Sequence, residues 1–128
     1  MPPATNSDAV FADEFREYLM GKLAAVEEQP FGPEVLVYKV KGKMFATLAI
    51  DADDGTGRAN LKCDPERALE LRCDYDAILP GYHMNKRHWN TLVLDGSLPA
   101  RLVRELVDHS WELVVAGLPN KVKAEIAK

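Results

Sequence analysis

Hydrophobic side chains recur every three or four positions in the first part of the chain, a spacing typical of a helix with one buried face. The repeat occupies residues 8–28 and consists of Phe11, Phe15, Tyr18, Leu19, Leu23 and Val26. Ser7 or Asp8 can cap its first turn, because a short side-chain oxygen accepts a hydrogen bond from a backbone N–H that lacks a partner inside the helix. The pattern predicts a helix that ends before Pro30.

The pattern then changes to one that is typical of strands. Val35–Val40 is rich in β-branched and aromatic residues, and Met44–Ile50 continues in the same manner after the turn at Lys41–Lys43. The glycine in that turn accepts a positive φ at little cost. A looser, acidic loop at 51–57 leads to a short stretch at Arg58–Cys63. We therefore expect three consecutive antiparallel strands.

The second half begins with a helix signal at Asp64-Pro65-Glu66, in which the aspartate can act as N-cap and the proline loses no hydrogen bond. The predicted helix stops before Pro80. Residues 82–94 are interpreted as a strand pair, or as one strand with an extended approach, and Trp89–Leu94 is the clearer part.

A last helix is predicted from about Ser97-Leu98-Pro99 to Gly117, with hydrophobic residues on one face. Asp108-His109-Ser110 interrupts the pattern with residues that favour caps, so we expect a break and a second start there. The tail from Asn120 is predicted to be frayed.

The order of these elements, α-β(3)-α-β(2)-α, predicts an α+β fold built as a two-layer α/β sandwich. One antiparallel sheet would have the helices on one of its faces. A chain of 128 residues has the size of a single domain. We expect the core of this domain within residues 8–118 and flexible tails at 1–7 and 119–128.

Charge is unevenly distributed along the chain. The sequence has 16 basic and 20 acidic residues, a net charge of -4, which excludes a protein that is basic over its whole surface. The acidic excess lies in residues 1–30 and 63–80, whereas the basic excess lies in 31–62 and 81–92. Predicted helices therefore carry the acidic charge and predicted strands the basic charge. One basic face would suit an anionic partner such as DNA.

Three features indicate a protein of the cytoplasm. The polar and helix-breaking residues after Met1 do not resemble a secretory leader. No apolar run approaches the ~20 residues that are needed to cross a bilayer, so we expect no membrane association. Cys63 and Cys73 are too few for a disulfide scaffold and are not spaced as a redox or metal pair, so both are expected to be buried free thiols.

No catalytic, metal or cofactor site is predicted. His83 and His88 stand five positions apart, which would place them on opposite faces of a strand. Asp108-His109-Ser110 contains the residue types of a nucleophilic triad, but neighbours in sequence rarely converge on one point. The acidic loop 51–57 lacks the ligand spacing of a calcium loop. We therefore expect a protein that is not an enzyme and has no cofactor.

The basic segments carry the most suggestive chemistry. The residues expected to contact phosphate are Lys39, Lys41, Lys43, Lys62, Lys86 and Arg87. Beside them stand residues suited to base contacts or to a small polar pocket, namely Tyr82, His83, Asn85, His88, Trp89 and Asn90. Cations mixed with amide and aromatic groups are typical of nucleic-acid interfaces. Lysines also protect edge strands against aggregation, and this alternative stays open.

Four stretches of the chain resemble the MmcQ/YjbR family of small bacterial proteins. They are Pro-Phe-Gly-Pro with Val-Tyr-Lys-Val-Lys-Gly-Lys-Met-Phe-Ala within 30–46, the linker 61–66, the segment 81–91, and Asp-His-Ser-Trp-Glu-Leu-Val at 108–114. The run His-Met-Asn-Lys-Arg-His-Trp in the third stretch is the most specific. The resemblance covers nearly all of the chain.

The resemblance implies a sandwich similar to the fold of type III secretion chaperones and, more loosely, to the CyaY-like fold. It implies no established enzyme activity. A double-wing DNA-binding motif has been suggested for the family, and its wings would lie here at the turn Lys41–Lys43 and around Lys86-Arg87. The leading hypothesis is therefore DNA binding without catalysis.

Two alternatives to DNA binding remain open at this point. One is a protein-interaction or chaperone-like module that recruits a protein partner through an exposed sheet surface. The other is a small-molecule site formed by His83, His88 and Trp89 together with Asn85. The sequence does not specify a preferred DNA sequence, an oligomeric state or a pathway, nor whether the basic segments share one face.

Overall fold

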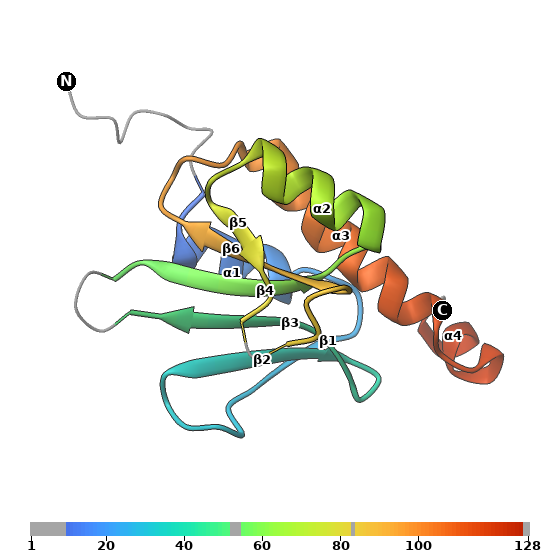
Figure 1. Ribbon diagram of the computed structural model, residues 1–128. Coiled ribbons are helices and arrows are strands. Elements are labelled where there is room, and N and C mark those ends of the chain that lie inside the picture. Colours follow the sequence, from blue (N-terminus) through green and yellow to red (C-terminus); the bar gives the residue numbers. More distant parts are fainter. Residues whose placement is uncertain (1–9, 52–54, 83, 127–128) are drawn as a thin grey trace.

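The computed structural model describes residues 10–51, 55–82 and 84–126 and has an α+β fold of two layers (Figure 1). Six strands form one antiparallel sheet in the order β1-β2-β3-β4-β6-β5. The strands are β1 (Ala25–Glu28), β2 (Val35–Val40), β3 (Lys43–Ile50), β4 (Gly57–Lys62), β5 (Ile78–Pro80) and β6 (Trp89–Leu94). The helices are α1 (Ala12–Met20), α2 (Pro65–Asp74), α3 (Ala100–Ala116) and α4 (Asn120–Ile126). The predicted fold class is confirmed.

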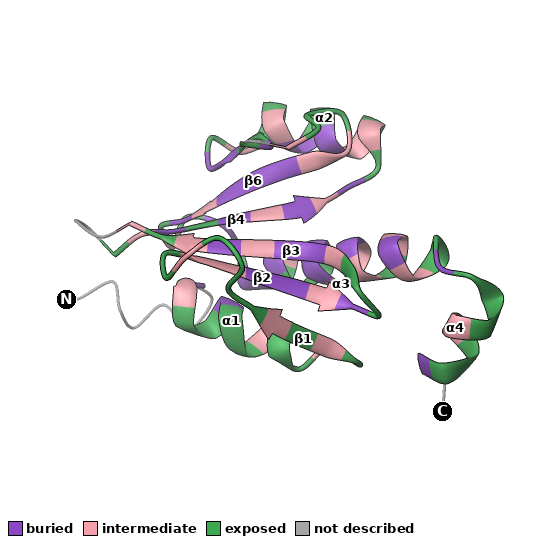
Figure 2. Ribbon diagram, turned by 90° about the horizontal axis from the view of Figure 1, so that it is seen from below, coloured by how far each residue is buried: buried purple, intermediate pink, exposed green. Residues whose placement is uncertain are grey.

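One face of the sheet is covered by helices. α3 contacts β2, β3 and β4, α1 contacts β1 and β3, and α2 covers the end formed by β5 and β6. The largest fully buried side chains of the core are Tyr38, Phe15, Phe45, Leu19, Leu48, Leu61, Ile78, Leu92 and Leu94. Figure 2 shows that burial is concentrated in the central strands and in α3, whereas α4 is largely exposed. Each such buried side chain stabilises the fold by about 1.5–3 kcal/mol.

The first predicted helix is wrong in its second half. α1 ends at Met20, and Ala25–Glu28 instead forms edge strand β1, which pairs with β2. The chain reverses through Ala24, whose φ of 61° lies in the left-handed region. Val26, which helical spacing assigned to a buried face, is 51% exposed on the edge strand. The predicted caps at residues 7 and 8 lie outside the described residues.

The predicted turn between β2 and β3 is confirmed as a two-residue hairpin. Lys41 and Gly42 have φ values of 50° and 82°, and positive φ at both central positions is the mark of a type I′ turn. The register then shifts between Tyr38 and Lys39, which leaves Phe45 without an opposite residue on β2. Phe45 is therefore the extra residue of a β-bulge, and its side chain is fully buried.

The second helix begins as predicted but is shorter. The Asp64 carboxylate accepts a hydrogen bond from the Arg67 N–H at 3.3 Å, which confirms its role as N-cap. The helix ends at Asp74, and Ile78–Pro80 forms the short strand β5 where the prediction had continued the helix. Trp89–Leu94 is a strand as predicted, and it pairs with β5 on one side and β4 on the other.

The C-terminal part differs from its prediction in two ways. α3 runs without a break through Asp108, His109 and Ser110, because their side chains bond to other segments and do not compete for the helix backbone. The predicted tail contains α4, in which Ile126 is buried. No helix in the described part of the chain is long and apolar enough to span a membrane.

Candidate nucleic-acid interface

The sheet face opposite the helices carries the polar side chains of β4 and β6. Because side chains alternate along a strand, Arg58, Asn60 and Lys62 point to this face, whereas the two residues between them are buried in the core. The register places Thr91 opposite Asn60, and Trp89 opposite Lys62. We call this surface the open face.

Residues 81–82 and 84–88 belong to the connection between β5 and β6, and they fold back over the open face (Figure 1). The Tyr82 N–H donates to Thr91 Oγ1 at 2.9 Å, and Asn60 Nδ2 donates to the Tyr82 carbonyl oxygen at 3.4 Å. Thr91 Oγ1 donates in turn to Asn60 Oδ1. These three hydrogen bonds form a closed ring that fixes the Tyr82 backbone on the sheet.

A second set of contacts holds the two ends of this connection. The Gly81 N–H donates to the Trp89 carbonyl oxygen at 3.0 Å, and the Cys63 N–H donates to the His88 carbonyl oxygen at 2.8 Å. A Cβ atom on Gly81 would lie 2.9 Å from both Cβ and the carbonyl oxygen of Trp89. Only glycine therefore permits this close approach.

Arg72 of α2 anchors the same connection from the side. Its Nε donates to Asn90 Oδ1 at 2.7 Å, and its Nη2 donates to the carbonyl oxygens of Lys86 and, at 3.4 Å, Trp89. Asn90 also donates to the Ala68 carbonyl oxygen at 3.3 Å. Sequence reasoning missed Arg72, because nothing in a helical pattern indicates which distant carbonyls a surface arginine reaches.

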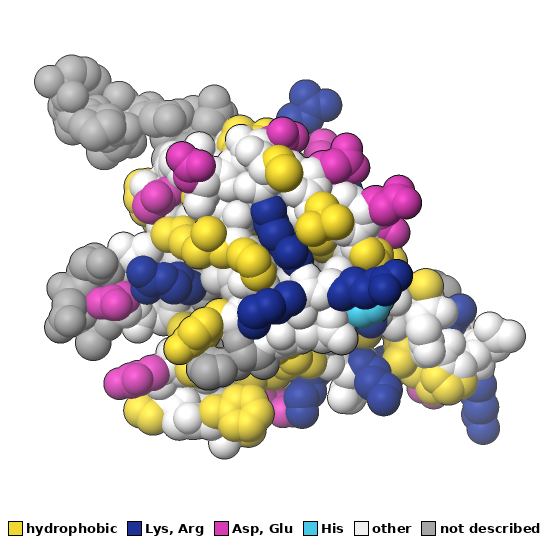
Figure 3. Space-filling view, in the orientation of Figure 1, with side chains coloured by type: hydrophobic (Ala, Val, Ile, Leu, Met, Phe, Trp, Pro, Cys, Tyr) yellow, Lys and Arg dark blue, Asp and Glu magenta, His cyan; other side chains and the backbone are white. Residues whose placement is uncertain are grey.

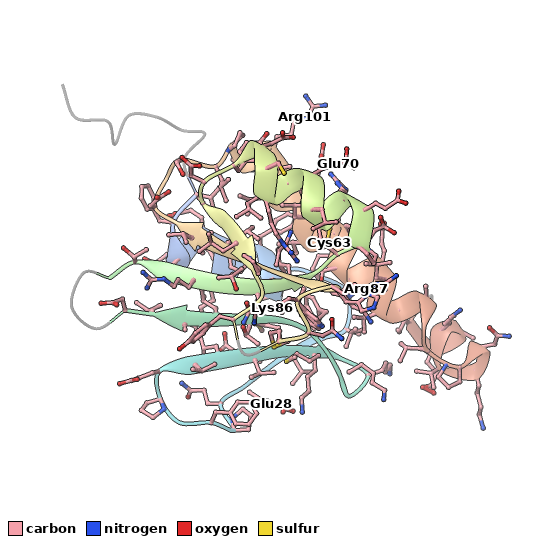
Figure 4. The ribbon with its side chains drawn as sticks, in the orientation of Figure 1. Glu28, Cys63, Glu70, Lys86, Arg87 and Arg101 are labelled. Carbon is pink, nitrogen blue, oxygen red and sulfur yellow. The ribbon has the colours of Figure 1, made fainter. Side chains whose placement is uncertain are left out.

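The structure brings four of the six predicted phosphate contacts to one side of the sheet. Lys39 lies on β2 and Lys62 on β4, two strands and therefore about 10 Å apart. Lys86 and Arg87 are exposed on the connection in front of the sheet (Figure 4). Lys39 is paired with Glu28 at 2.9 Å. Figure 3 shows Lys and Arg side chains across the middle of this face and Asp and Glu mainly at its margins.

The other two predicted contacts are placed elsewhere. Lys41 lies at the tip of the β2–β3 hairpin, where its Nζ is 3.7 Å from Glu125 Oε1 of α4. Lys43 stands opposite Val40, whose side chain is buried in the core, so the two side chains project toward the helix side of the sheet. Lys39, Lys41 and Lys43 therefore follow the turn and do not share one face.

The predicted polar and aromatic residues also separate. Tyr82 is 68% exposed on the connection, and Trp89 is half-buried on the open face. Asn85 accepts a hydrogen bond from the Arg87 N–H at 2.9 Å and shapes the local turn. Asn90 is 2% exposed on the core side of β6, so it supports the fold and is not available for base contacts. His83 lies outside the described residues.

The half-buried His88 does not line the groove of about 470 Å³ that lies between α2 and the connection. That groove is lined by Pro65, Glu66, Leu69, Arg72, Lys86 and Arg87. Of the residues predicted to form a small-molecule site, the described His88 and Trp89 are not among those that line this groove. The groove instead adjoins the basic residues of the connection.

Asp108-His109-Ser110 joins α3 to other elements of the fold and does not form a triad. The Asp108 carboxylate accepts hydrogen bonds from the Tyr18 hydroxyl at 2.7 Å and from Lys22 Nζ at 2.8 Å. Burial raises the pKa of Asp108, but the hydrogen bonds from Lys22 and Tyr18 outweigh it and leave that pKa below its ordinary value. Burial and the contact with Asp108 raise the pKa of Tyr18 to about 12.

The next two side chains of this segment each hold a different strand or helix end. His109 Nε2 accepts a hydrogen bond from the Asp64 N–H at 3.2 Å, at the start of α2. The pKa of His109 is lowered, mainly by burial and secondly by the positive charge of Arg67. The lowered pKa keeps the ring neutral for this contact. Ser110 bonds to the backbone of β3 and β4. All three residues of the motif are thus occupied by structural contacts.

The two thiols differ in environment. Cys63 is buried at the end of β4, and burial raises the pKa of its thiol, which disfavours the reactive thiolate. Cys73 is exposed on α2, so the prediction of two buried thiols is wrong for this residue. Within the described ranges, no three His, Cys, Asp or Glu side chains are grouped so that they could hold a metal ion.

A family model described as YjbR matches residues 20–113, which include the whole sheet and most of α3. The chain belongs to the YjbR family. Among its relatives, the uncharacterized protein YbdF of Escherichia coli O157:H7 is 41% identical over 92 residues, 72% of this chain and 74% of that protein. The uncharacterized protein YjbR of Escherichia coli K12 is 33% identical over 108 residues, 84% of this chain and 90% of that protein.

Solved structures agree with the YjbR-family assignment. The crystal structure of Deinococcus radiodurans protein DR2400, a DUF419 domain, superposes with a TM-score of 0.82 at 39% identity and covers 96% of this chain and 91% of that chain. A protein from Pseudomonas syringae superposes with a TM-score of 0.71 at 29% identity, over 81% of this chain and 98% of that one. The predicted resemblance to the family is therefore confirmed.

Proposed function

We propose that this YjbR-family protein binds DNA through its open face, without catalysis. The proposed phosphate contacts are Lys39, Lys62, Lys86 and Arg87. The observation that carries the proposal is the placement of these four cations on one side of the sheet, on an otherwise acidic chain. Lys41 and Lys43 are left out of the proposed contact surface because they follow the hairpin turn away from it.

The net charge of -4 does not oppose this proposal. Charges farther apart than about 10 Å are largely screened at 0.1 M salt, so DNA on the open face is affected mainly by the charges of that face. Contacts between lysine or arginine and phosphate release counterions, and binding of this kind weakens steeply as salt rises. Because the slope of this salt dependence grows with the number of phosphates contacted, four cations predict weak binding with a smaller salt dependence than a large basic surface has.

The proposal includes no catalysis because the side chains that could react are already held in structural contacts or buried. Asp108, His109 and Ser110 are held in contacts that join α3 to α1, to the start of α2 and to β3 respectively. Cys63 is buried with a raised thiol pKa. These groups would have to leave structural contacts before they could act on a substrate.

A titration of labelled DNA at several salt concentrations tests the proposal. The variant Lys86→Ala with Arg87→Ala removes two positive charges from the open face. Arg101→Ala with Lys121→Ala removes two from exposed positions on α3 and α4 and is the matched control. We expect the first pair to weaken binding and to reduce the slope of log K against log salt by about 2, and the second pair to leave both unchanged.

Two results would overturn the proposal. One is the lack of any binding at low salt by a protein whose thermal unfolding shows that it is folded. The other is equal loss of affinity in both double variants, which would mean that net charge and not the open face determines the interaction.

A further inference from the structure

Tyr82 combines high exposure with a backbone that is fixed in place. Its side chain is 68% exposed, while its N–H and carbonyl oxygen are both bonded to the open face through Thr91 and Asn60. Gly81, the preceding residue, is packed against Trp89 too closely for a side chain. An exposed ring on such a backbone is presented to solvent at little further cost in conformational entropy.

A cation lies beside the backbone at Tyr82. Lys86 Nζ donates to the Gly81 carbonyl oxygen at 3.2 Å, and that carbonyl belongs to the peptide bond that joins Gly81 to Tyr82. Arg87 follows on the exposed side of the same connection. Aromatic rings beside a basic track are the combination that proteins use for single strands, because every base has a face that can stack.

We propose that the preferred ligand of the open face is single-stranded DNA, with one base stacked on Tyr82 and a neighbouring phosphate bound by Lys86. This inference rests on the proposed function and specifies the class of DNA. In a duplex the faces of the bases are already stacked, so the same contact would first require unstacking, which costs a few kcal/mol per step.

The surrounding charge favours the same choice. Figure 4 shows Lys86 and Arg87 between Glu28 on one side and Glu70 of α2 on the other. The positive charge of the connection therefore has acidic side chains on both sides. A duplex carries one charge per about 1.7 Å of its axis, twice the density of one strand, and it is stiff. A single strand is flexible enough to follow Lys86 and Arg87 and to keep its phosphates away from Glu28 and Glu70.

Fluorescence anisotropy with an oligothymidylate of about 20 nucleotides and a duplex of the same length tests this inference. We expect the single strand to bind at least about tenfold more tightly than the duplex at the same salt. Tyr82→Leu, which keeps an apolar side chain without an aromatic face, should lose between about fivefold and a hundredfold in affinity for the single strand. Tyr82→Phe should retain it, and both variants should unfold at the wild-type temperature.

The outcomes separate this inference from the proposed function. Equal or tighter binding of the duplex overturns the preference for single strands while DNA binding stands. Unchanged affinity of Tyr82→Leu for the single strand overturns the stacking role of Tyr82. Lack of binding to either DNA overturns the proposed function and this inference with it.

Discussion

The Ser110 hydroxyl donates a 2.6 Å hydrogen bond to the carbonyl oxygen of Phe45, the extra residue of the bulge in β3. The same hydroxyl accepts a hydrogen bond from the Lys62 N–H of β4 at 2.9 Å. The last pair of the β3–β4 ladder at this end is Ala46 with Leu61, so Phe45 and Lys62 lie one position beyond the ladder. Ser110 therefore bridges two backbone groups that the bulge separates, and it links α3 to the sheet at the point where the ladder is interrupted.

Replacing Ser110 with alanine should be among the more destabilising changes in α3. The variant leaves a buried N–H and a buried carbonyl without their bridge, and each unsatisfied buried group costs about 1–3 kcal/mol. We expect the free energy of unfolding in urea to fall by about 2 kcal/mol or more. Glu112→Ala, at an exposed position on the same helix, should change it by less than about 0.5 kcal/mol. Similar values for the two variants would contradict the bridging role.

The contact between His109 and the Asp64 N–H should make stability depend on pH. His109 must be neutral at Nε2 to accept this bond, and its pKa in the folded protein lies below the ordinary value of 6.5. The unfolded chain therefore binds more protons than the folded chain as pH falls below about 6.5. We expect the contribution of His109 to be complete above that pH and to be lost as pH falls toward its lowered pKa.

Urea unfolding at pH 8 and pH 5 of the wild type and His109→Gln measures this effect. Glutamine accepts a hydrogen bond without titrating, so the variant should lose less stability between the two pH values. The carboxylates Glu27, Asp95 and Asp108 also have lowered pKa values, but their ordinary values are 4.5 or less and they affect stability mainly below pH 5. The same decrease in both proteins would show that His109 is not responsible.

Arg72 should control the order of the 81–88 connection. Arg72→Lys keeps the charge but cannot donate simultaneously to Asn90 and to the carbonyls of Lys86 and Trp89, since lysine lacks the planar fork of arginine. We expect a loss of about 1–3 kcal/mol in unfolding free energy, because buried Asn90 loses a donor. Trypsin should cleave after Lys86 and Arg87 faster than in the wild type. An unchanged cleavage rate would mean that other contacts hold the connection.

Local signals were sufficient for some elements of this fold and misleading for others. Asp64-Pro65 marked the start of α2, and Gly42 marked the hairpin, because capping and positive φ depend on the residue itself. Val26 has helical spacing but belongs to β1, whose formation depends on pairing with β2. Asp108-His109-Ser110 looked like a break because the distant partners of these side chains cannot be seen in a local pattern.

The candidate site was predictable as a set of residue types and not as a surface. Charge counts identified the basic segments, but they do not assign Lys39 and Lys43 to a face of the sheet. The bulge and the hairpin turn place Lys43 on the other side, opposite buried Val40. The anchoring role of Arg72 depends on tertiary packing of α2 against β6. Such placements follow from register and packing, which composition does not contain.

The hairpin tip offers a change that should stabilise the protein and leave DNA binding intact. Lys41 has a φ of 50°, a conformation that costs a residue with a side chain about 1–2 kcal/mol and that asparagine tolerates better. Lys41→Asn also removes the 3.7 Å ion pair with Glu125, but exposed pairs of this kind contribute about 0–1 kcal/mol. We expect the unfolding free energy to rise by about 0.5–1 kcal/mol. Gly42→Ala, which places a side chain at a φ of 82°, should lower it and serves as the opposite control.

In the DNA titration, Lys41→Asn should match the wild type, because the hairpin tip lies outside the proposed contact surface. A loss of affinity equal to that of the Lys86 and Arg87 double variant would extend the contact surface to the tip.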